Sequence, residues 1–395
     1  MDTRQFIEEH LHDDVHELAL KHSNAKVDMA LALRQIEARQ LLQKKVPSWS
    51  DNPELLFPAH LSIEQCSSEA TALYKASLMN SNTFADLTGG LGVDCYYISR
   101  NFQHADYVEQ NPELCKLAQH NFAILQAMDI AVHNESSESF LKHCDPLDLI
   151  FLDPARRDSH GHKTVSIADC TPNVIQLQEL LLSKARRVMV KLSPMLDISM
   201  ALKELHHVKE IHVVAVANEC KELLFIMEPG DDDELHYTCV NLQSNQEPVH
   251  FTQEEERVAT LQLAKEVGRY LYEPNAAVMK GGCFRLLSHR YGLYKLHRNS
   301  HLYTSDHWVP DFPGRIFEVE DWTVFGKKAK TILAGIEKAS IAVRNFPLSV
   351  AELRKSLKIS DGDQVYLFAT TLSDERKILI KTKKANRNQD PTPHS

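Results

Sequence analysis

The sequence predicts an α/β protein in which a doubly wound, mostly parallel sheet follows a helical region and precedes two small α+β domains. The chain has 395 residues, more than the roughly 250 to 300 at which one hydrophobic core stops growing, so several domains are expected. From about residue 83, short apolar runs alternate with helical stretches, which is typical of βαβ units. With 43% hydrophobic and 25% charged residues, the composition is that of a globular protein.

Residues 1–78 form the predicted helical region. Apolar residues recur there at three- and four-residue spacing: Phe6, Leu11, Val15 and Leu18. The segment 28–45 is rich in strong helix formers. A further helix is expected over 62–79, where Ser62 can cap the first turn.

The predicted sheet lies in residues 79–250. Strands are expected at 83–87, 105–109, 129–133, 147–152 and 187–192, and helices at 92–101, 112–126, 172–184 and 198–205. The runs HVVAVA and ELLFIME, separated by NECK, predict an antiparallel pair that finishes the sheet. Because such sheets bind ligands beyond the carboxyl ends of their strands, the loops after these strands are the expected place of a site.

Two small domains are predicted after a helix at about 253–271. The first, 272–325, is dense in Gly, aromatic residues and His. The second, 326–395, has a helix at 352–357 and two strands, VYLFATT and KILIKT, that are joined by a turn around residues 373–375.

The net charge of −10 argues against nucleic-acid binding through the whole surface, but the charge is uneven. Residues 326–395 carry 14 Lys and Arg against 7 Asp and Glu, a net charge of +7, whereas the rest carries 30 against 47, a net charge of −17. A basic segment on an acidic body fits a module that faces a polyanion. An ordinary solvated tail explains the run KTKKANRNQ equally well.

Eight single cysteines and a polar N-terminus predict a cytoplasmic protein without a membrane anchor. No C-x-x-C pair begins a zinc or redox motif, so free thiols and no bound metal are expected. No stretch approaches the roughly 18 apolar residues of a membrane span, and the acidic start MDTRQFIEEHLHDD is unlike a signal peptide.

The segment FADLTGGLGVD, residues 84–94, predicts a nucleoside-binding turn between a strand and a helix. Its glycines Gly89, Gly90 and Gly92 allow the backbone to approach a ligand closely, beside Thr88. Glu109, at the end of the next strand, can accept both hydroxyls of a ribose. The alternative is a strand–turn–helix with chance acids.

Two further acids decide between nucleoside ligands. Asp86 and Asp94 beside the loop would repel a pyrophosphate but can pair with the ammonium group of a methionine moiety. The acids therefore favour S-adenosylmethionine over a dinucleotide. In this acid–small–Gly-rich form the segment resembles the first motif of the class I S-adenosylmethionine-dependent methyltransferases.

The segment LDLIFLDPARRD, residues 147–158, resembles the fourth, catalytic motif of that superfamily. Pro154 constrains the backbone before it, which can direct the Asp153 carboxyl into a cleft. The aromatic residue that usually follows in amino-methylating members is replaced by Arg156, whose guanidinium plane could stack on a base instead. Arg156 and Arg157 could also contact substrate phosphate or form ion pairs with Asp158 and Asp169.

The chain as a whole resembles a bacterial group of methyltransferases with a THUMP-like C-terminal domain. The resemblance rests on DPARRDSHGHKT, DCTPNV, VKLSPMLD, NECKELLF, SIEQCSSEATALYKA, EPNAAVMKGGCF, LHRNSHLYTSD and RNFPLSVAELRKSLK. It implies a helical N-terminal region, a Rossmann-like methyltransferase core, a ferredoxin-like domain at 272–325 and a THUMP-like domain at 326–395. The resemblance does not supply the substrate of this group, but THUMP domains proper bind RNA, which gives the basic C-terminal segment a role in binding tRNA or rRNA.

The resemblance further places Glu135 or its neighbour Ser136 near the adenine of the donor. Lys191, after the fifth strand, could line the substrate cleft or merely enter a helix. His160 and His162 follow the fourth motif but lack the further ligands of a metal site, so we interpret them as a polar loop.

We therefore expect an S-adenosylmethionine-dependent methyltransferase that acts on RNA. Its terminal domain would bind the substrate through basic residues, with Arg344, Lys355, Lys358 and Lys381 among them. Two alternatives stay open: a protein that binds the donor and RNA with little turnover, and an enzyme that methylates a protein or a small molecule. A nicotinamide-dependent oxidoreductase is a third, which the Asp-Pro sequence after the fourth strand and the acids around the glycine loop disfavour. The target atom and the oligomeric state are not encoded in any recognisable pattern.

Overall fold

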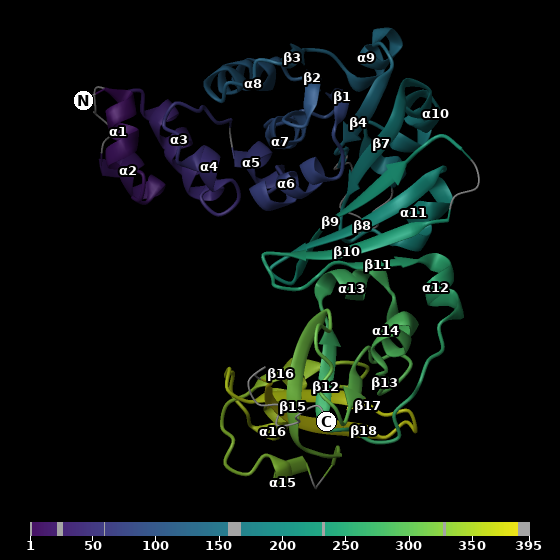
Figure 1. The fold of residues 1–395 in the computed structure, drawn as a ribbon. Coiled ribbons are helices and arrows are strands. Elements are labelled where there is room, and N and C mark those ends of the chain that lie inside the picture. Colours follow the sequence, from purple (N-terminus) through teal and green to yellow (C-terminus); the bar gives the residue numbers. More distant parts are fainter. Residues whose placement is uncertain are drawn as a thin grey trace, which may run out of the picture. The chain divides into compact units, whose positions relative to one another are not determined.

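The computed structural model of the chain consists of two compact units (Figure 1). It describes residues 2–21, 27–58, 60–156, 167–230, 234–326 and 329–385, with the backbone alone for residues 60–62, Arg156 and Lys330. The first unit comprises Met1–Ile211 and Lys221–Asp233. The second comprises His212–Cys220 and Glu234–Ser395.

The N-terminal part of the first unit is helical, as predicted. Its helices are α1 (Thr3–Glu9), α2 (Val15–Lys21), α3 (Met29–Leu42), α4 (Pro47–Ser50), α5 (His60–Gln65) and α6 (Glu69–Ser77). The prediction of one continuous helix over 62–79 is wrong, because the helix stops after Gln65 and restarts at Glu69. Ser68 begins the new helix: its Oγ accepts a hydrogen bond from the Thr71 backbone N–H at 3.3 Å.

Five parallel strands form the centre of the first unit. They are β1 (Ser81–Asp86), β2 (Phe102–Val108), β3 (Ile130–His133), β4 (Leu147–Leu152) and β7 (Ala185–Leu192). The last of them pairs antiparallel with β9 (Glu219–Met227), so the order is β9-β7-β4-β1-β2-β3. The helices between them are α7 (Val93–Ser99), α8 (Pro112–Ile124), α9 (Ser137–His143), α10 (Val174–Lys184) and α11 (Ile198–Glu204). All five parallel strands are confirmed within a few residues.

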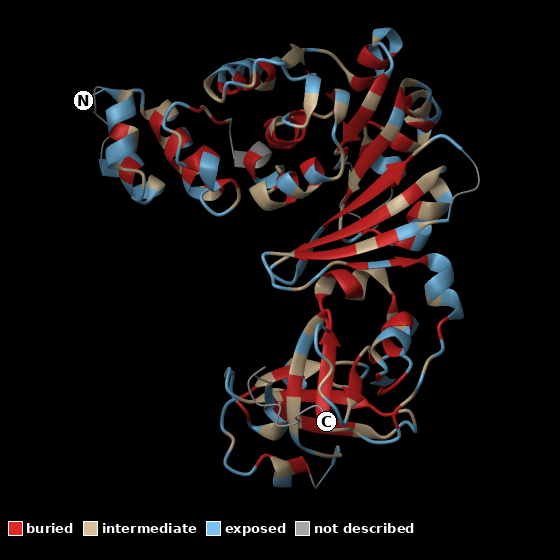
Figure 2. Cartoon of the chain, in the orientation of Figure 1, coloured by how far each residue is buried: buried red, intermediate tan, exposed pale blue. Residues whose placement is uncertain are grey.

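Continuous apolar runs explain why β1 and β4 occupy the middle of this sheet. Phe84 and Leu149 are completely buried, and Figure 2 shows the central strands in the colour of buried residues. Such burial on both faces is typical of parallel strands covered by helices. Because β1, β2 and β4 run in one direction, Asp86, Glu109 and Asp153 emerge at the same edge.

The antiparallel end of the sheet extends further than the sequence predicted. The pair HVVAVA and ELLFIME forms β8 (Val208–Val216) and β9, which are neighbours in the sheet. In the second unit, however, β10 (His236–Leu242) lies beside β8 and pairs antiparallel with β11 (Val249–Thr252). The closing hairpin is therefore β10–β11, which the sequence analysis did not predict.

The helix predicted over 253–271 is also wrong in its length. Helix α12 (Gln253–Val258) begins with a capping box between Thr252 and Glu255 but ends after one and a half turns. The segment that follows leads into β12 (Tyr270–Pro274), whose residues pair with strands on both sides. Pairing of the aromatic residues in a sheet outweighs the helix propensity of the preceding segment.

A single sheet joins the two ranges predicted as small domains. Its strands follow the order β13-β14-β12-β15-β18-β17-β16. They are β12, β13 (Tyr294–Lys295), β14 (Tyr303–Ser305), β15 (Gly314–Val324), β16 (Ser340–Val343), β17 (Tyr366–Thr371) and β18 (Lys377–Lys384). Helices α13 (Ala276–Gly281), α14 (Phe284–Tyr291), α15 (Ala329–Ile332) and α16 (Val350–Leu357) accompany them. Residues from both ranges therefore share hydrophobic clusters, as Phe317 and Phe368 do.

Candidate active site

A cavity of about 280 Å³ lies at the carboxyl edge of β1, β2 and β4. All nine residues predicted to bind the donor line it: Asp86, Thr88, Gly89, Gly90, Gly92, Asp94, Glu109, Glu135 and Ser136. Asp153 lines it as well, together with Cys66 and Ser67 from the turn between α5 and α6. The loops that the sequence set far apart thus form one site within the first unit.

The glycine-rich loop needs its glycines for two different reasons. Gly92 caps α7 with a φ of +87°, and Gly90 has a φ of +54°, conformations that L side chains rarely adopt. A Cβ atom on Gly89 would lie 2.3 Å from the Tyr107 ring. The loop therefore packs tightly against β2 and presents backbone rather than side chains to the cavity.

Glu109 connects this loop to the end of β2. Its Oε2 accepts a hydrogen bond from the Gly90 N–H at 3.1 Å, and its Oε1 accepts one from the Asn111 N–H at 2.8 Å. A carboxylate oxygen can accept more than one hydrogen bond, so each keeps capacity for a ligand hydroxyl. The carboxylate is fixed in position before any ligand arrives.

Two acids at opposite ends of the loop have different protonation behaviour. Burial raises the pKa of Asp86 to about 8, against hydrogen bonds from the Thr88 N–H and hydroxyl. Burial alone would also raise the pKa of Asp94, but the charges of Lys75 and Lys191 outweigh it and lower the pKa below its ordinary value. Asp94 is therefore the acid that stays ionised at neutral pH.

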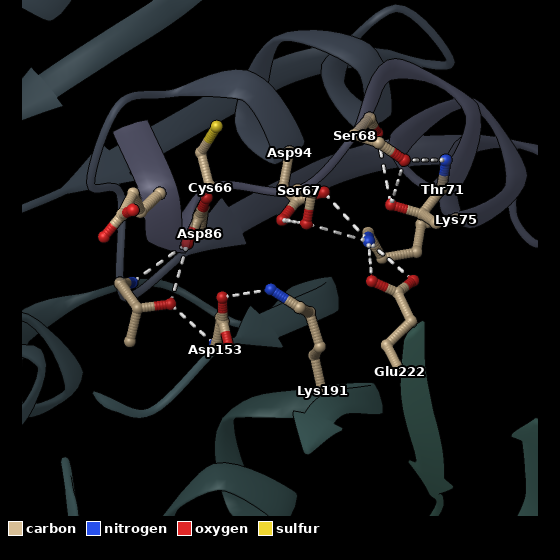
Figure 3. A network of polar contacts seen from close by, with 12 residues as sticks. Cys66, Ser67, Ser68, Thr71, Lys75, Asp86, Asp94, Asp153, Lys191 and Glu222 are labelled. Atoms are coloured by element: carbon tan, nitrogen blue, oxygen red, sulfur yellow. Dashed lines mark hydrogen bonds and ion pairs between the residues drawn. The ribbon is translucent and has the colours of Figure 1, made fainter. Parts of the chain in front are cut away.

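Behind Asp94 lies a buried polar network that sequence reasoning missed (Figure 3). The Ser67 hydroxyl donates to Asp94 Oδ2 at 2.6 Å, and Lys75 Nζ lies 3.1 Å from Asp94 Oδ1. The same Lys75 ammonium donates to both carboxylate oxygens of Glu222 at 2.8 and 2.9 Å. The sequence signals of this network were a lysine in the helix over 69–77 and a glutamate at the polar start of β9.

Asp153 is held by two neighbours at the end of β4. Its backbone N–H donates to Thr88 Oγ1 at 2.7 Å, and its carboxylate accepts a hydrogen bond from Lys191 Nζ. The parallel register, which pairs Leu152 with Val190, brings Asp153 and Lys191 side by side. Burial alone would lower the pKa of Lys191, but the charge of Asp153, with those of other carboxylates, raises it well above its ordinary value.

The remaining predicted donor contacts occupy one wall of the cavity. Glu135 pairs with His143 at 3.1 Å, and Ser136 caps α9 by accepting from the Ser139 N–H at 3.2 Å. Hydrogen bonds from Ser139 and His143 lower the pKa of the Glu135 carboxyl despite a small opposing effect of burial. Both residues are thus held at the start of the helix, within reach of the cavity.

The predicted substrate contacts are dispersed. Pro154 is buried behind Asp153, and the backbone of Arg156 pairs with Cys170 in the short ribbon of β5 (Ala155–Arg156) and β6 (Cys170–Thr171). Arg157, His160 and His162 lie outside the described residues. Arg344 lies in the second unit, where its guanidinium donates to Glu273 Oε1 at 2.7 Å.

The residues present fit S-adenosylmethionine. The glycine loop leaves room for a nucleoside close to the backbone, and Glu109 offers two oxygens at one side. At the other side Asp94 Oδ1 is buried and has no hydrogen-bond partner among the described residues. Lys75 Nζ lies 3.1 Å from this oxygen without donating a hydrogen bond to it, so the carboxylate keeps capacity for the ammonium group of a methionine moiety.

A solved structure shows which family the chain belongs to. The chain aligns with a crystal structure from Porphyromonas gingivalis W83, assigned as a methyltransferase, at 34% identity and a TM-score of 0.87, covering 97% of this chain and 98% of the other. The chain belongs to this methyltransferase family. The resemblance inferred from the sequence is therefore confirmed, and the chain is an S-adenosylmethionine-dependent methyltransferase.

More distant relatives and domain profiles support the same family. Two uncharacterized S-adenosylmethionine-dependent methyltransferases from two strains of Mycobacterium tuberculosis are each 22% identical over 301 residues, which is 75% of this methyltransferase and 79% of theirs. Residues 270–313 match a ferredoxin-like domain and 314–384 match a THUMP domain-like family. Among the described residues of the methyltransferase, none of the helices has both the length and the apolar composition that crossing a membrane requires.

Proposed function

We propose that this methyltransferase transfers the donor's methyl group to a nitrogen of an RNA base, with Asp153 as the residue that positions the acceptor. The observation that carries the proposal is the Asp153 carboxylate, which lines the donor cavity and is fixed by Thr88 and Lys191. S-adenosylmethionine would supply a methyl group already activated by its positive sulfur, so alignment is the main task of the protein.

Each part of the cavity has a proposed task in that alignment. Glu109 would accept hydrogen bonds from the ribose hydroxyls, and the glycine loop would hold the backbone close to the nucleoside. Asp94 would pair with the ammonium group, and Glu135 or Ser136 would lie beside the adenine. At the other wall the Asp153 carboxylate would accept a hydrogen bond from an N–H of the acceptor and receive its proton after transfer.

The Lys191 ammonium holds the Asp153 carboxylate in place by a hydrogen bond. A carboxylate that is fixed in this way can accept a hydrogen bond from the acceptor and hold it in line with the methyl group. Such a group suits an acceptor nitrogen that attacks while still neutral and loses its proton afterwards. An exocyclic amine of a nucleobase has this chemistry.

The RNA substrate is supported by the C-terminal part of the chain. The match of residues 314–384 to a THUMP domain-like family and the net charge of +7 over 326–395 both favour a polyanionic partner. Many of these basic residues are already paired, as Lys381 is with Glu320 at 3.2 Å. Lys338, Lys355 and Lys358 are exposed and have no ion-pair partner in the described parts of the chain, which makes them the favoured contacts.

Comparison of RNA from cells with and without the gene tests the acceptor. Mass spectrometry of nucleosides should reveal one methylated nucleoside that disappears with the gene and returns with the wild-type protein but not with Asp153→Asn. Identical nucleoside profiles, together with methyl transfer by the purified protein to a protein extract, would redirect the proposal to a protein substrate.

A further inference from the structure

The charge of Asp94 depends on how Lys75 distributes its hydrogen bonds. Lys75 is completely buried, and its ammonium lies between two carboxylates, those of Asp94 and Glu222. Figure 3 shows the three side chains converging from α6, α7 and β9. One cation between two anions leaves the group with a net negative charge.

Lys75 favours Glu222 over Asp94. It donates hydrogen bonds to both Glu222 oxygens and to Ser67 Oγ at 3.2 Å. Asp94 Oδ1, although 3.1 Å away, receives no hydrogen bond from the described residues. Because an ammonium has three N–H donors, these three hydrogen bonds use its full capacity.

The four residues of this network lie at different positions relative to the cavity. Asp94 and Ser67 line the cavity, whereas Lys75 and Glu222 lie behind them and do not. The member of this group that lies at the cavity is therefore the Asp94 carboxylate, which shares the Lys75 cation with Glu222. A carboxylate whose charge is balanced only in part by a shared cation is a favourable site for a second cationic group.

We infer that Glu222 is a positioning residue for donor binding: by holding Lys75, it keeps the Asp94 carboxylate available for the ammonium group of the methionine moiety. The inference rests on the proposed role of the cavity as the donor site. Without the Glu222 charge, Lys75 would turn its hydrogen bonds to Asp94 and neutralise the cavity wall.

Calorimetric titration of Glu222→Gln with two nucleosides tests the inference. S-adenosylhomocysteine carries the amino-acid moiety, whereas 5′-methylthioadenosine lacks it but shares the adenosine and sulfur. Glu222→Gln should bind S-adenosylhomocysteine about tenfold more weakly, equivalent to about 1.4 kcal/mol, and 5′-methylthioadenosine as well as the wild type does. A merely structural role would weaken both ligands together.

Glu228→Gln is the matched control, because Glu228 follows the same strand and pairs with Arg187 at 2.5 Å, away from the cavity lining. It should bind both nucleosides like the wild type. A second variant, Lys75→Met with Glu222→Leu, removes the cation and its partner together and should recover S-adenosylhomocysteine affinity to within a few-fold of wild type at pH 8.

The outcomes separate this inference from the donor assignment. If the wild type binds neither nucleoside, the cavity is not the donor site and the proposed function fails. If the wild type binds both, but Glu222→Gln loses affinity for both equally or for neither, the role of Glu222 is wrong while the donor site stands. If Glu222→Gln does not fold, failure of the double variant to bind S-adenosylhomocysteine overturns the inference.

Discussion

Glu109 carries two backbone hydrogen bonds as well as its proposed ribose contacts, so its replacement reports on the donor site directly. We expect Glu109→Ala to weaken S-adenosylhomocysteine binding by about 1 to 3 kcal/mol, since a charge-assisted acceptor is removed. Calorimetry measures this, with Glu113→Ala as control, because Glu113 is exposed and pairs only with Lys116 among the described residues. Equal affinities of the folded Glu109 variant and the wild type would refute the ribose contact.

Replacement of Asp153 should slow methyl transfer without weakening donor binding. We expect Asp153→Asn to bind S-adenosylhomocysteine within a few-fold of the wild type and to lower the rate of methyl transfer roughly 100-fold, because the amide cannot take the acceptor's proton. Asp148→Asn, on the same strand but paired with β1 residues at its other end, should retain activity. A collapse of donor binding in Asp153→Asn would assign this residue to the donor site instead.

Asp86 makes stability depend on pH. Its pKa rises from the ordinary 3.8 to about 8 on folding, because burial disfavours the charged carboxylate. The folded protein therefore holds this proton more tightly than the unfolded chain, and stability should fall as pH rises from about 4 toward 8. Melting temperatures measured from pH 5 to 8 should fall less steeply for Asp86→Asn than for the wild type. Parallel curves would contradict the raised pKa.

At the scale of an element, two glycines at the start of α7 allow the cost of a strained backbone to be compared with the cost of a side-chain clash. Both Gly90 and Gly92 have positive φ angles, so Ala at either should cost about 1 to 2 kcal/mol. Only at Gly92 would the new Cβ meet another side chain, Phe122 Cζ at 2.9 Å. Urea unfolding should show Gly92→Ala less stable than Gly90→Ala by roughly another 1 to 3 kcal/mol. Equal losses of stability would show that Phe122 moves aside freely.

The elements and site residues that could be predicted are those marked by a pattern of neighbouring residues in the sequence. The parallel strands are short apolar runs, and the acids that follow them reach one edge because neighbouring parallel strands end together. Lys75 and Glu222 could not be found this way, because they lie 147 positions apart in sequence and only the fold joins them. The helix expected over 253–271 failed for the same reason: β12 gains its hydrogen bonds from β14 and β15.

At the scale of the whole molecule, the charges of the second unit predict how RNA would bind. We expect Ala at Lys338, Lys355 and Lys358 together to weaken binding to cellular RNA about tenfold. Binding should also depend less on salt: the slope of log K against the logarithm of the salt concentration should become shallower by about 0.7 for each phosphate that the protein no longer neutralises. Fluorescence anisotropy over a salt series measures both, while S-adenosylhomocysteine affinity should not change.

The control for this prediction replaces three exposed lysines of the first unit, Lys116, Lys142 and Lys203. Substitution is preferable to truncation, because removal of residues 326–395 would take β18 away from β15 and disrupt the shared sheet. If both triple variants bind RNA like the wild type, the proposed surface on the THUMP-like domain is wrong.

The shared sheet also sets the order in which the second unit can fold. Strand β18 lies between β15 and β17, so it is an interior strand although it is formed late in the chain. During synthesis one edge of β15 stays unpaired until residues 377–384, which form β18, have emerged from the ribosome. An unpaired edge can associate with other chains. The nascent second unit is therefore most prone to aggregation just before its synthesis reaches β18.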